Sequence, residues 1–368
     1  MELNPLYSSV QINSLQPDLF KLKSMYTLNE STDVQQHVPN DENLFFNWVV
    51  FSLIMNTCIS SLIGLLGLVS NVINMVVFFH QGLNSSITIS LFCMALTDIF
   101  TILFVLWANI CFNPYIETVR APFYFGELFY FTGGWPSGFS VRVTLYITVY
   151  ITAERCLCIL FPLSIKTLIT PGRTRVVVGI IIVLNALTLV PEYSSIYLSW
   201  QFSPERNETL LGAAFRSNRA ETHGVTFLLH VLLVIVGQVC VIILTGVLII
   251  HLRRQTEWRM KSVGDKKKET SYSARDRKSQ ALVIVVATSV VVCYIPLTPV
   301  SLITVFMPEF SIGGKYSKVF VDTWDTIFVF SLINAASNIL IYYKMNSKFR
   351  TKLLQLVHRH GYLDQGRP

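Results

Sequence analysis

The chain has 368 residues, of which 52% are hydrophobic and only 14% are charged, and its mean hydropathy is +0.51. Soluble proteins carry about 25% charged residues, so this composition argues against an ordinary cytosolic enzyme, and the high apolar content excludes disorder for most of the chain. The formal net charge of +7 sits beside apolar segments, which indicates a membrane rather than nucleic acid as the partner.

Seven apolar stretches are long enough to cross a bilayer. A helix needs about 20 mostly apolar residues to do so, because no water satisfies backbone groups in the hydrocarbon. We therefore predict an all-α membrane protein with a seven-helix bundle over residues 48–343, preceded by a polar tail over residues 1–47. We expect the first span to act as the insertion signal. The predicted spans are residues 48–79, 87–112, 129–158, 174–191, 224–251, 279–305 and 322–343.

Lysine and arginine in the loops predict the orientation. With the N-terminus outside, the outer segments carry eight of these residues and the inner segments nineteen, as the positive-inside rule requires. Two glycosylation sequons, at Asn29 and Asn207, then fall outside, and a third, at Asn84, falls inside and is expected to stay unmodified. We expect a plasma-membrane protein with an extracellular N-terminus and a cytoplasmic C-terminus.

One carboxylate lies deep within a predicted span. Asp98 stands in the middle of the second span, where an unpartnered charge costs free energy. Asn71, Thr144, Asn334 and Asn338 lie at similar depth on other spans. If these groups converge, they form either an oxygen-rich site of the kind that hard cations prefer or a hydrogen-bonded cluster that packs helices without an ion. The residue types alone leave both readings open.

The third span contains one arginine within its length and another at its inner end. Arg142 lies 13 residues before Arg155, about 20 Å higher along a helix, in the outer half of the bundle. It either anchors an anionic ligand group or pairs internally, with Asp322 or Asp325 as the candidate acid.

At the inner end of the same span, Glu154 stands next to Arg155. A neighbouring carboxylate neutralises an arginine locally, and Asp276, on the far side of a basic loop, is placed to clamp that arginine across helices. The alternative is a pair of solvated boundary charges.

Five short motifs occur in order, each on its own span. Together they resemble the rhodopsin-like (class A) G-protein-coupled receptors over residues 48–350, and their divergence is similar to that of invertebrate neuropeptide or chemosensory receptors. The motifs are Ser70-Asn71, Ala95-Leu96-Thr97-Asp98, Glu154-Arg155-Cys156 with the following Pro162-Leu163, Cys293-Tyr294-Ile295-Pro296, and Asn338-Ile339-Leu340-Ile341-Tyr342.

The resemblance implies roles for these positions. Residues matching Asp98, Asn71, Thr144, Asn334 and Asn338 line or adjoin an allosteric sodium pocket in that family, and sodium there favours the resting state. No other cofactor is expected.

For activation, the resemblance implies that Arg155 is released to meet a heterotrimeric G protein, and Asp276 matches the acid that locks this arginine. Tyr294 stands at a rotamer switch, and Pro296 kinks the sixth helix. The expected activation residues are Glu154, Arg155, Asp276, Tyr294, Pro296, Asn338 and Tyr342.

After the seventh span, residues 344–368 predict an amphipathic eighth helix on the cytoplasmic surface. Phe349, Leu353 and Leu356 recur at helical spacing among basic residues. The seven cysteines all lie in or at the ends of spans, and Tyr130 stands where the receptor family usually has its third-helix cysteine. We therefore expect no disulfide, and the second outer loop, residues 192–223, either packs in place or stays mobile.

The leading functional prediction is a receptor that catalyses nothing and binds an extracellular peptide or small chemosensory molecule. Ser137 replaces the aspartate that holds amines in aminergic receptors, which disfavours an amine ligand. The rival prediction is a seven-span transporter or ligand-gated channel, although no repeated halves are visible. The expected ligand-pocket residues are Ser137, Arg142, Tyr294, Trp324, Asp325, Phe328 and Ser331.

Overall fold

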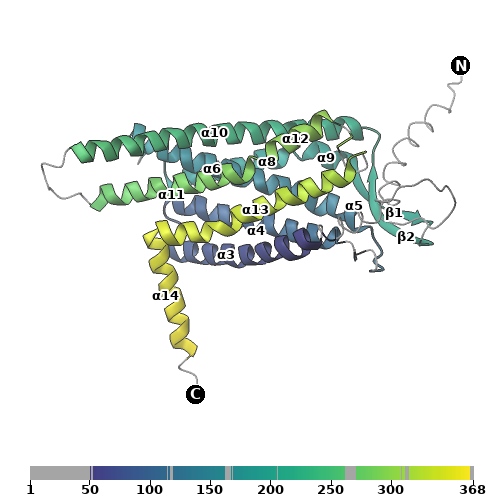
Figure 1. The fold of residues 1–368 in the computed structure, drawn as a ribbon, viewed down its shortest axis with the longest axis horizontal. Helices are drawn as coiled ribbons and strands as arrows, with labels where there is room; N and C mark the ends of the chain where they lie inside the picture. The colour runs from purple at the N-terminus through teal and green to yellow at the C-terminus, as the bar shows by residue number, and fades with distance from the viewer. Residues whose placement is uncertain are drawn as a thin grey trace.

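The computed structural model describes residues 50, 53–113, 115–116, 119–161, 167, 169–204, 206–261, 271–307, 309–310 and 315–364. These residues form an elongated bundle of helices that run back and forth along one axis (Figure 1). Seven of the helical segments are long and apolar enough to cross a membrane. The predicted seven-helix membrane fold is confirmed. The predicted tail over residues 1–47, with Asn29, lies outside the described residues.

Several spans are built from more than one helical element, because local breaks interrupt them. The elements, in chain order, are η2 (Leu53–Ser60) and α3 (Ser61–Gln81) in the first span, α4 (Ser86–Cys111) in the second, α5 (Phe125–Phe129), η4 (Tyr130–Gly134) and α6 (Trp135–Leu160) in the third, α8 (Pro171–Leu187) and α9 (Val190–Ser195) in the fourth, α10 (Arg219–Lys261) in the fifth, α11 (Ser271–Tyr294) and α12 (Leu297–Phe306) in the sixth, α13 (Ser317–Met345) in the seventh, and α14 (Ser347–Asp364) after it.

The side chains of the bundle are arranged as expected in lipid. On α3 the apolar residues Leu62, Leu66 and Val69 are more than half exposed, whereas the polar residues Asn71 and Asn74 are completely buried. A soluble helix shows the opposite arrangement. Hydrocarbon can cover the apolar face, and the buried polar groups find partners only inside the bundle.

The sixth span breaks at Pro296, between α11 and α12. Proline has no backbone N–H and its ring displaces the preceding carbonyl, so a straight helix cannot continue through it. The kink expected from the sequence is therefore present in the structure.

A two-stranded hairpin follows α9, in a chain predicted to be all helical. Strand β1 (Ile196–Ser203) pairs antiparallel with β2 (Glu208–Phe215), in a register that places Ile196 opposite Phe215. The hairpin projects from one end of the bundle, which we call the hairpin end, and α14 lies at the other, which we call the α14 end (Figure 1). Asn207 in the turn adopts a positive φ of 51°, a conformation that asparagine tolerates better than most residues.

Helix α14 turns sharply away from the bundle axis (Figure 1). Phe349 in its first turn is completely buried and packs against Phe78 of α3 and Tyr342 of α13, with ring centroids 5.3 and 5.7 Å away. Leu353 and Leu356 are partly buried against the same cluster. The three apolar residues that predicted an amphipathic helix therefore form its contact with the bundle.

Candidate functional site

The buried carboxylate of Asp98 joins three spans. Its Oδ1 accepts a hydrogen bond from Thr144 Oγ1 of α6 at 3.1 Å, and its Oδ2 accepts one from Asn338 Nδ2 of α13 at 2.8 Å. Thr144 also shares a 2.8 Å hydrogen bond with Thr97. The Asp98 side chain is almost completely buried, so these neutral donors replace the water that it would otherwise need. The structure thus brings Asp98, Thr144 and Asn338 together.

Asn71 and Asn334 adjoin this site without contacting the carboxylate. Asn71 Nδ2 donates to the backbone oxygens of Gly67 and Ala335, each at 2.9 Å, and so ties α3 to α13. Asn334 Oδ1 accepts from Ser289 of α11 at 3.3 Å. Tyr342, one turn beyond Asn338, is completely buried, and its hydroxyl contacts Met94 Sδ at 3.6 Å.

The donor set fits a monovalent cation. In the described part of the chain, Asn338 Oδ1 has no hydrogen-bond partner although it is buried, and it belongs to the same amide that bonds Asp98. The described residues hold no group of three or more His, Cys, Asp or Glu that would suit a more highly charged metal. One carboxylate with neutral hydroxyl and amide oxygens is a set that a hard cation prefers.

Glu154 is the main polar contact at the α14 end of the third span. Its buried carboxylate forms an ion pair with Arg155 and accepts a hydrogen bond from Ser86 at the start of α4. Ser86 and Tyr150 in turn hydrogen-bond Thr174 of α8, at 2.6 and 2.9 Å. The structure places Glu154 and Arg155 together as expected. The side chain of Asp276 lies outside the described residues, so the proposed clamp on Arg155 stays a prediction.

Gln238 of α10 spans the break in the sixth span. Its Nε2 donates to the backbone oxygen of Tyr294 at 2.7 Å, and its Oε1 accepts from Thr298 Oγ1 at 2.6 Å. The backbone N–H of Thr298 bonds Ile295 instead of continuing the α-helical pattern. The glutamine therefore satisfies a carbonyl that the break at Pro296 has freed.

Arg142 is completely buried and faces the fourth and fifth spans. Its guanidinium donates to Asn185 Oδ1 at 3.3 Å and to Thr188 Oγ1 at 3.0 Å, and it contacts His230 Nδ1. These direct contacts go to α8 and α10, whereas the sequence had pointed to Asp322 or Asp325 on α13. No carboxylate lies within 4.0 Å of this cation among the described side chains.

The other predicted ligand-pocket residues lie on α6, α11 and α13. Tyr294 is buried in an apolar cluster with Ile327, and Trp324 packs against this cluster. The rings of Trp324 and Phe328 are tilted against each other, with centroids 6.2 Å apart. The indole N–H of Trp324 is buried without a partner. The Ser137 hydroxyl donates to the backbone oxygen of Gly134 at the end of η4, and the Ser331 hydroxyl donates to that of Ile327 in its own helix. Asp325 is buried.

A further polar cluster, which we call the Glu192 cluster, closes the hairpin end. The carboxylate of Glu192 is completely buried, pairs with Arg219 at the start of α10, and accepts hydrogen bonds from Tyr130 at 2.5 Å and His223 at 3.2 Å. Trp135 Nε1 donates to the Tyr130 hydroxyl at 3.1 Å. This cluster joins the third, fourth and fifth spans where the hairpin leaves the bundle.

The hairpin is also held directly. Strand β2 bonds the segment before α5, with Leu211 N donating to Pro122 O at 2.8 Å, and the Glu127 carboxylate accepts from Ala213 N at 2.8 Å. All seven cysteines are free thiols. Packing and hydrogen bonds thus hold the second loop, which was one of the two expected alternatives.

The sequence did not predict four polar residues that form hydrogen bonds or ion pairs in these sites. Asn185, Glu192, His230 and Gln238 all lie in or at the ends of apolar spans and are buried. The signal that could have found them is the one that identified Asp98, namely the free-energy cost of a polar side chain in hydrocarbon.

The described residues form seven membrane-capable helices, with a hydrogen-bonded polar network in their middle and an arginine at one end of the bundle. This arrangement fits a seven-helix membrane receptor. The model of the family described as Serpentine type 7TM GPCR chemoreceptor Srw matches residues 58–360, more than half of the chain. The chain belongs to this family. No curated protein matches it.

Proposed function

We propose that the chain is a chemoreceptor that detects a small extracellular molecule at the hairpin end and activates a heterotrimeric G protein at the α14 end. The excess of lysine and arginine in the segments of the α14 end supports a cytoplasmic placement of that end. The family match supports a chemosensory ligand over a neuropeptide. The protein would therefore act at the plasma membrane.

The observation that carries this proposal is the ion pair of Arg155 with Glu154. At the α14 end of the bundle, Arg155 pairs with the carboxylate of Glu154, which also accepts a hydrogen bond from Ser86 of α4. The buried Nε of Arg155 has no hydrogen-bond partner among the described residues. A cation that is only partly satisfied gains contacts when another surface approaches. Its release from Glu154 toward a G protein is a change between two discrete arrangements.

The break at Pro296 supports a moving sixth span. On the α14 side of the break, α11 is a separate helix, and Gln238 of α10 hydrogen-bonds the backbone oxygen of its last residue, Tyr294. A small shift of α12 by a ligand would therefore become a larger outward movement of the α14 end of α11. The Asp98 network would oppose this movement, since it joins α4, α6 and α13 in one arrangement. A sodium ion bound there would supply positive charge that compensates the Asp98 carboxylate.

The ligand site is proposed between α6, α10, α12 and α13 at the hairpin end. Trp324 supplies a buried, unpaired N–H donor, and Phe328 supplies apolar surface. Arg142 of α6, which contacts His230 of α10, has only neutral hydrogen-bond partners among the described side chains. An anionic group on the ligand would provide the missing counter-charge, and we place such a group beside Arg142 and His230.

The proposal is tested by GTP loading. Cells that express the chain with a promiscuous G protein are screened with small organic molecules, including carboxylic acids, and the active compound is then used with purified components. We expect agonist-dependent GTP loading in the wild type and none in Arg155→Ala at equal surface expression. Arg175→Ala, which removes another cation from the same end, should load normally. Unchanged loading in Arg155→Ala would contradict the proposal, and an ion current without any G protein would favour a channel or transporter.

A further inference from the structure

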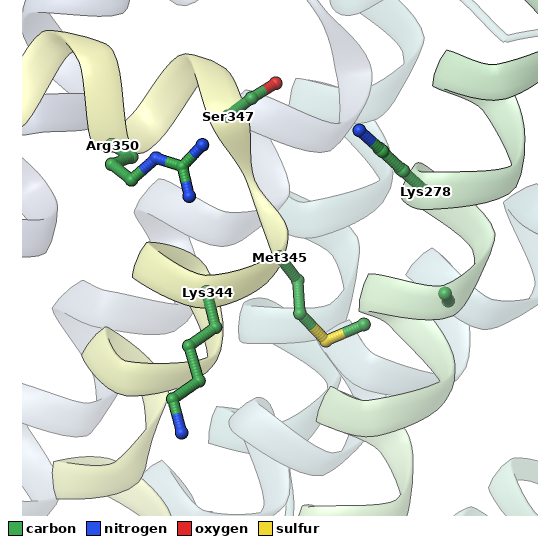
Figure 2. Close-up of a pocket in the computed structure, with 6 residues that line it drawn as sticks. Lys278, Lys344, Met345, Ser347 and Arg350 are labelled. Carbon is green, nitrogen blue, oxygen red and sulfur yellow. The ribbon is translucent and has the colours of Figure 1, made fainter.

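A cavity of about 290 Å³ opens at the α14 end, where three helices meet. It lies between the beginning of the membrane-spanning part of α11, the end of α13 and the first turn of α14 (Figure 2). Its volume is just below the range of about 300 to 1,000 Å³ that is typical of small-molecule sites. The lining residues are Lys278, Ala281, Lys344, Met345, Ser347 and Arg350.

The lining is strongly positive. Half of the six residues are cations, contributed by three different helices, and among the side chains that the structure describes none of these cations has a carboxylate within 4.0 Å. In Figure 2, Lys278 from α11 and Arg350 from α14 extend toward the space beside Ser347, whereas Lys344 runs the other way. Like charges that converge without an acid repel one another, so an anion between them would lower the free energy of the site.

The start of α14 adds to this field. The helix begins at Ser347 and continues for 18 residues. Its N-terminal N–H groups and dipole favour a negative charge in its first turn. Asn346 caps part of this end, because its side-chain oxygen accepts from Phe349 N at 3.1 Å. The pocket therefore combines an arginine fork, the Lys278 ammonium, a serine hydroxyl and a helix N-terminus, with Lys344 in its lining.

We propose that this pocket binds a phosphate group of an anionic membrane lipid, with a multiply phosphorylated inositol headgroup as the best fit. Arginine binds phosphate oxygens bidentately, and lysine acts beside it as a point charge. Met345 and Ala281 form an apolar part of the lining that suits the glycerol carbons and the first acyl carbons of a lipid. The proposal concerns lipid binding alone and does not depend on G-protein coupling.

A lipid fits the position of the pocket better than a free anion does. The pocket is lined by Met345, the residue at which the last membrane-capable helix ends. From there α14 turns away from the bundle axis (Figure 1). Lipid phosphates lie at this level beside the end of a membrane span. Basic residues close to membrane ends attract anionic lipids by about 1 kcal/mol per Lys or Arg.

The test uses the full chain in phosphatidylcholine nanodiscs, with or without phosphatidylinositol bisphosphate. We expect the lipid to raise the thermal unfolding temperature and to stay bound in native mass spectrometry. The double variant Lys278→Gln, Arg350→Gln, which keeps polar but shorter and uncharged side chains, should weaken binding by about tenfold or more. The matched control Lys348→Gln, Lys352→Gln removes two cations from α14 that do not line the pocket. It loses the same non-specific attraction, so it should weaken binding clearly less than the pocket variant does.

Three outcomes would overturn the proposal. Equal loss in the control pair would show that only the net charge of α14 matters. Equal stabilisation by phosphatidylserine at matched charge would show non-specific attraction. Soluble inositol trisphosphate binding as tightly as the lipid would confirm the anion chemistry and overturn the assignment to a lipid. Unfolding temperatures in pure phosphatidylcholine show whether a variant is folded, and Arg350→Lys provides a folded variant that lacks only the bidentate fork.

Discussion

Arg219 at the start of α10 and Glu192 in α9 form an ion pair that closes the hairpin end of the bundle, and Tyr130 of η4 contacts both. Its hydroxyl donates to Glu192 and accepts from Arg219, each at 2.5 Å. Arg219 also lies over the rings of Phe215 and Tyr130. Tyr130 holds the position at which the receptor resemblance places a disulfide cysteine. A hydrogen-bonded, non-covalent tether therefore stands at this point of the bundle.

We expect Glu192→Gln to destabilise the hairpin end. The substitution leaves the Arg219 charge without its partner, and breaking a buried pair in this way costs about 3 kcal/mol. Hydrogen exchange in β1 and β2 should become faster than in the wild type, while exchange in α14 should be unchanged.

A double variant distinguishes the loss of the Glu192–Arg219 ion pair from a general loss of stability. Glu192→Gln combined with Arg219→Met should cost less than the sum of the two single changes, because the second change removes the orphaned charge. Strictly additive losses would show that the two side chains do not act on each other.

Asp98→Asn tests the cation site. The amide keeps the size of the side chain and removes the negative charge, so any sodium-dependent stabilisation should disappear. The measurement is the thermal unfolding temperature in sodium chloride against choline chloride at equal ionic strength. The wild type should unfold at a higher temperature in sodium, and the variant should unfold equally in both salts. A sodium effect that survives in Asp98→Asn would leave Asp98 as a packing residue.

Gln238→Leu tests the connection across the break in the sixth span. It removes both hydrogen bonds and leaves the Tyr294 carbonyl and the Thr298 hydroxyl unsatisfied in an apolar environment, at about 1–3 kcal/mol for each buried group. We expect a lower unfolding temperature. We also expect a changed basal rate of GTP loading, because α11 loses a hydrogen bond that restrains its end at Tyr294. Val239→Leu, an exposed apolar neighbour, is the control. An unfolding temperature equal to the wild type would argue against this role for Gln238.

Asn207 reports the orientation of the chain. It is exposed at the turn of the hairpin, and the sequon Asn207-Glu208-Thr209 is intact. If the hairpin end is extracellular, the protein from animal cells should carry a glycan there, and Asn207→Gln should remove one glycosidase-sensitive mobility shift. Asn84 lies between α3 and α4 at the other end and should stay unmodified. A glycan on Asn84 would reverse the orientation and, with it, the proposed side of G-protein binding.

The sequence determined the number of spans and the identity of the central polar site. Hydrocarbon offers no partners to backbone or polar side chains, so about 20 apolar residues specify a crossing, and each polar group among them stands out. Asp98, Thr144 and Asn338 were found in this way, and the structure joins them directly. The apolar spacing of Phe349, Leu353 and Leu356 similarly predicted α14.

Only the tertiary structure decided which polar groups meet. Arg142 turns toward Asn185 and His230, whereas the charges in the sequence pointed to the acids of α13, because the direction of a side chain around a helix depends on how that helix is rotated against its neighbours. The partners of Glu192 lie 27 to 62 residues away along the chain. Those of Gln238 lie 56 to 60 residues away. The apolar periodicity of a segment predicts that it is a helix and which of its faces is apolar. It does not predict the contacts across the bundle, because these depend on how the helices pack against one another.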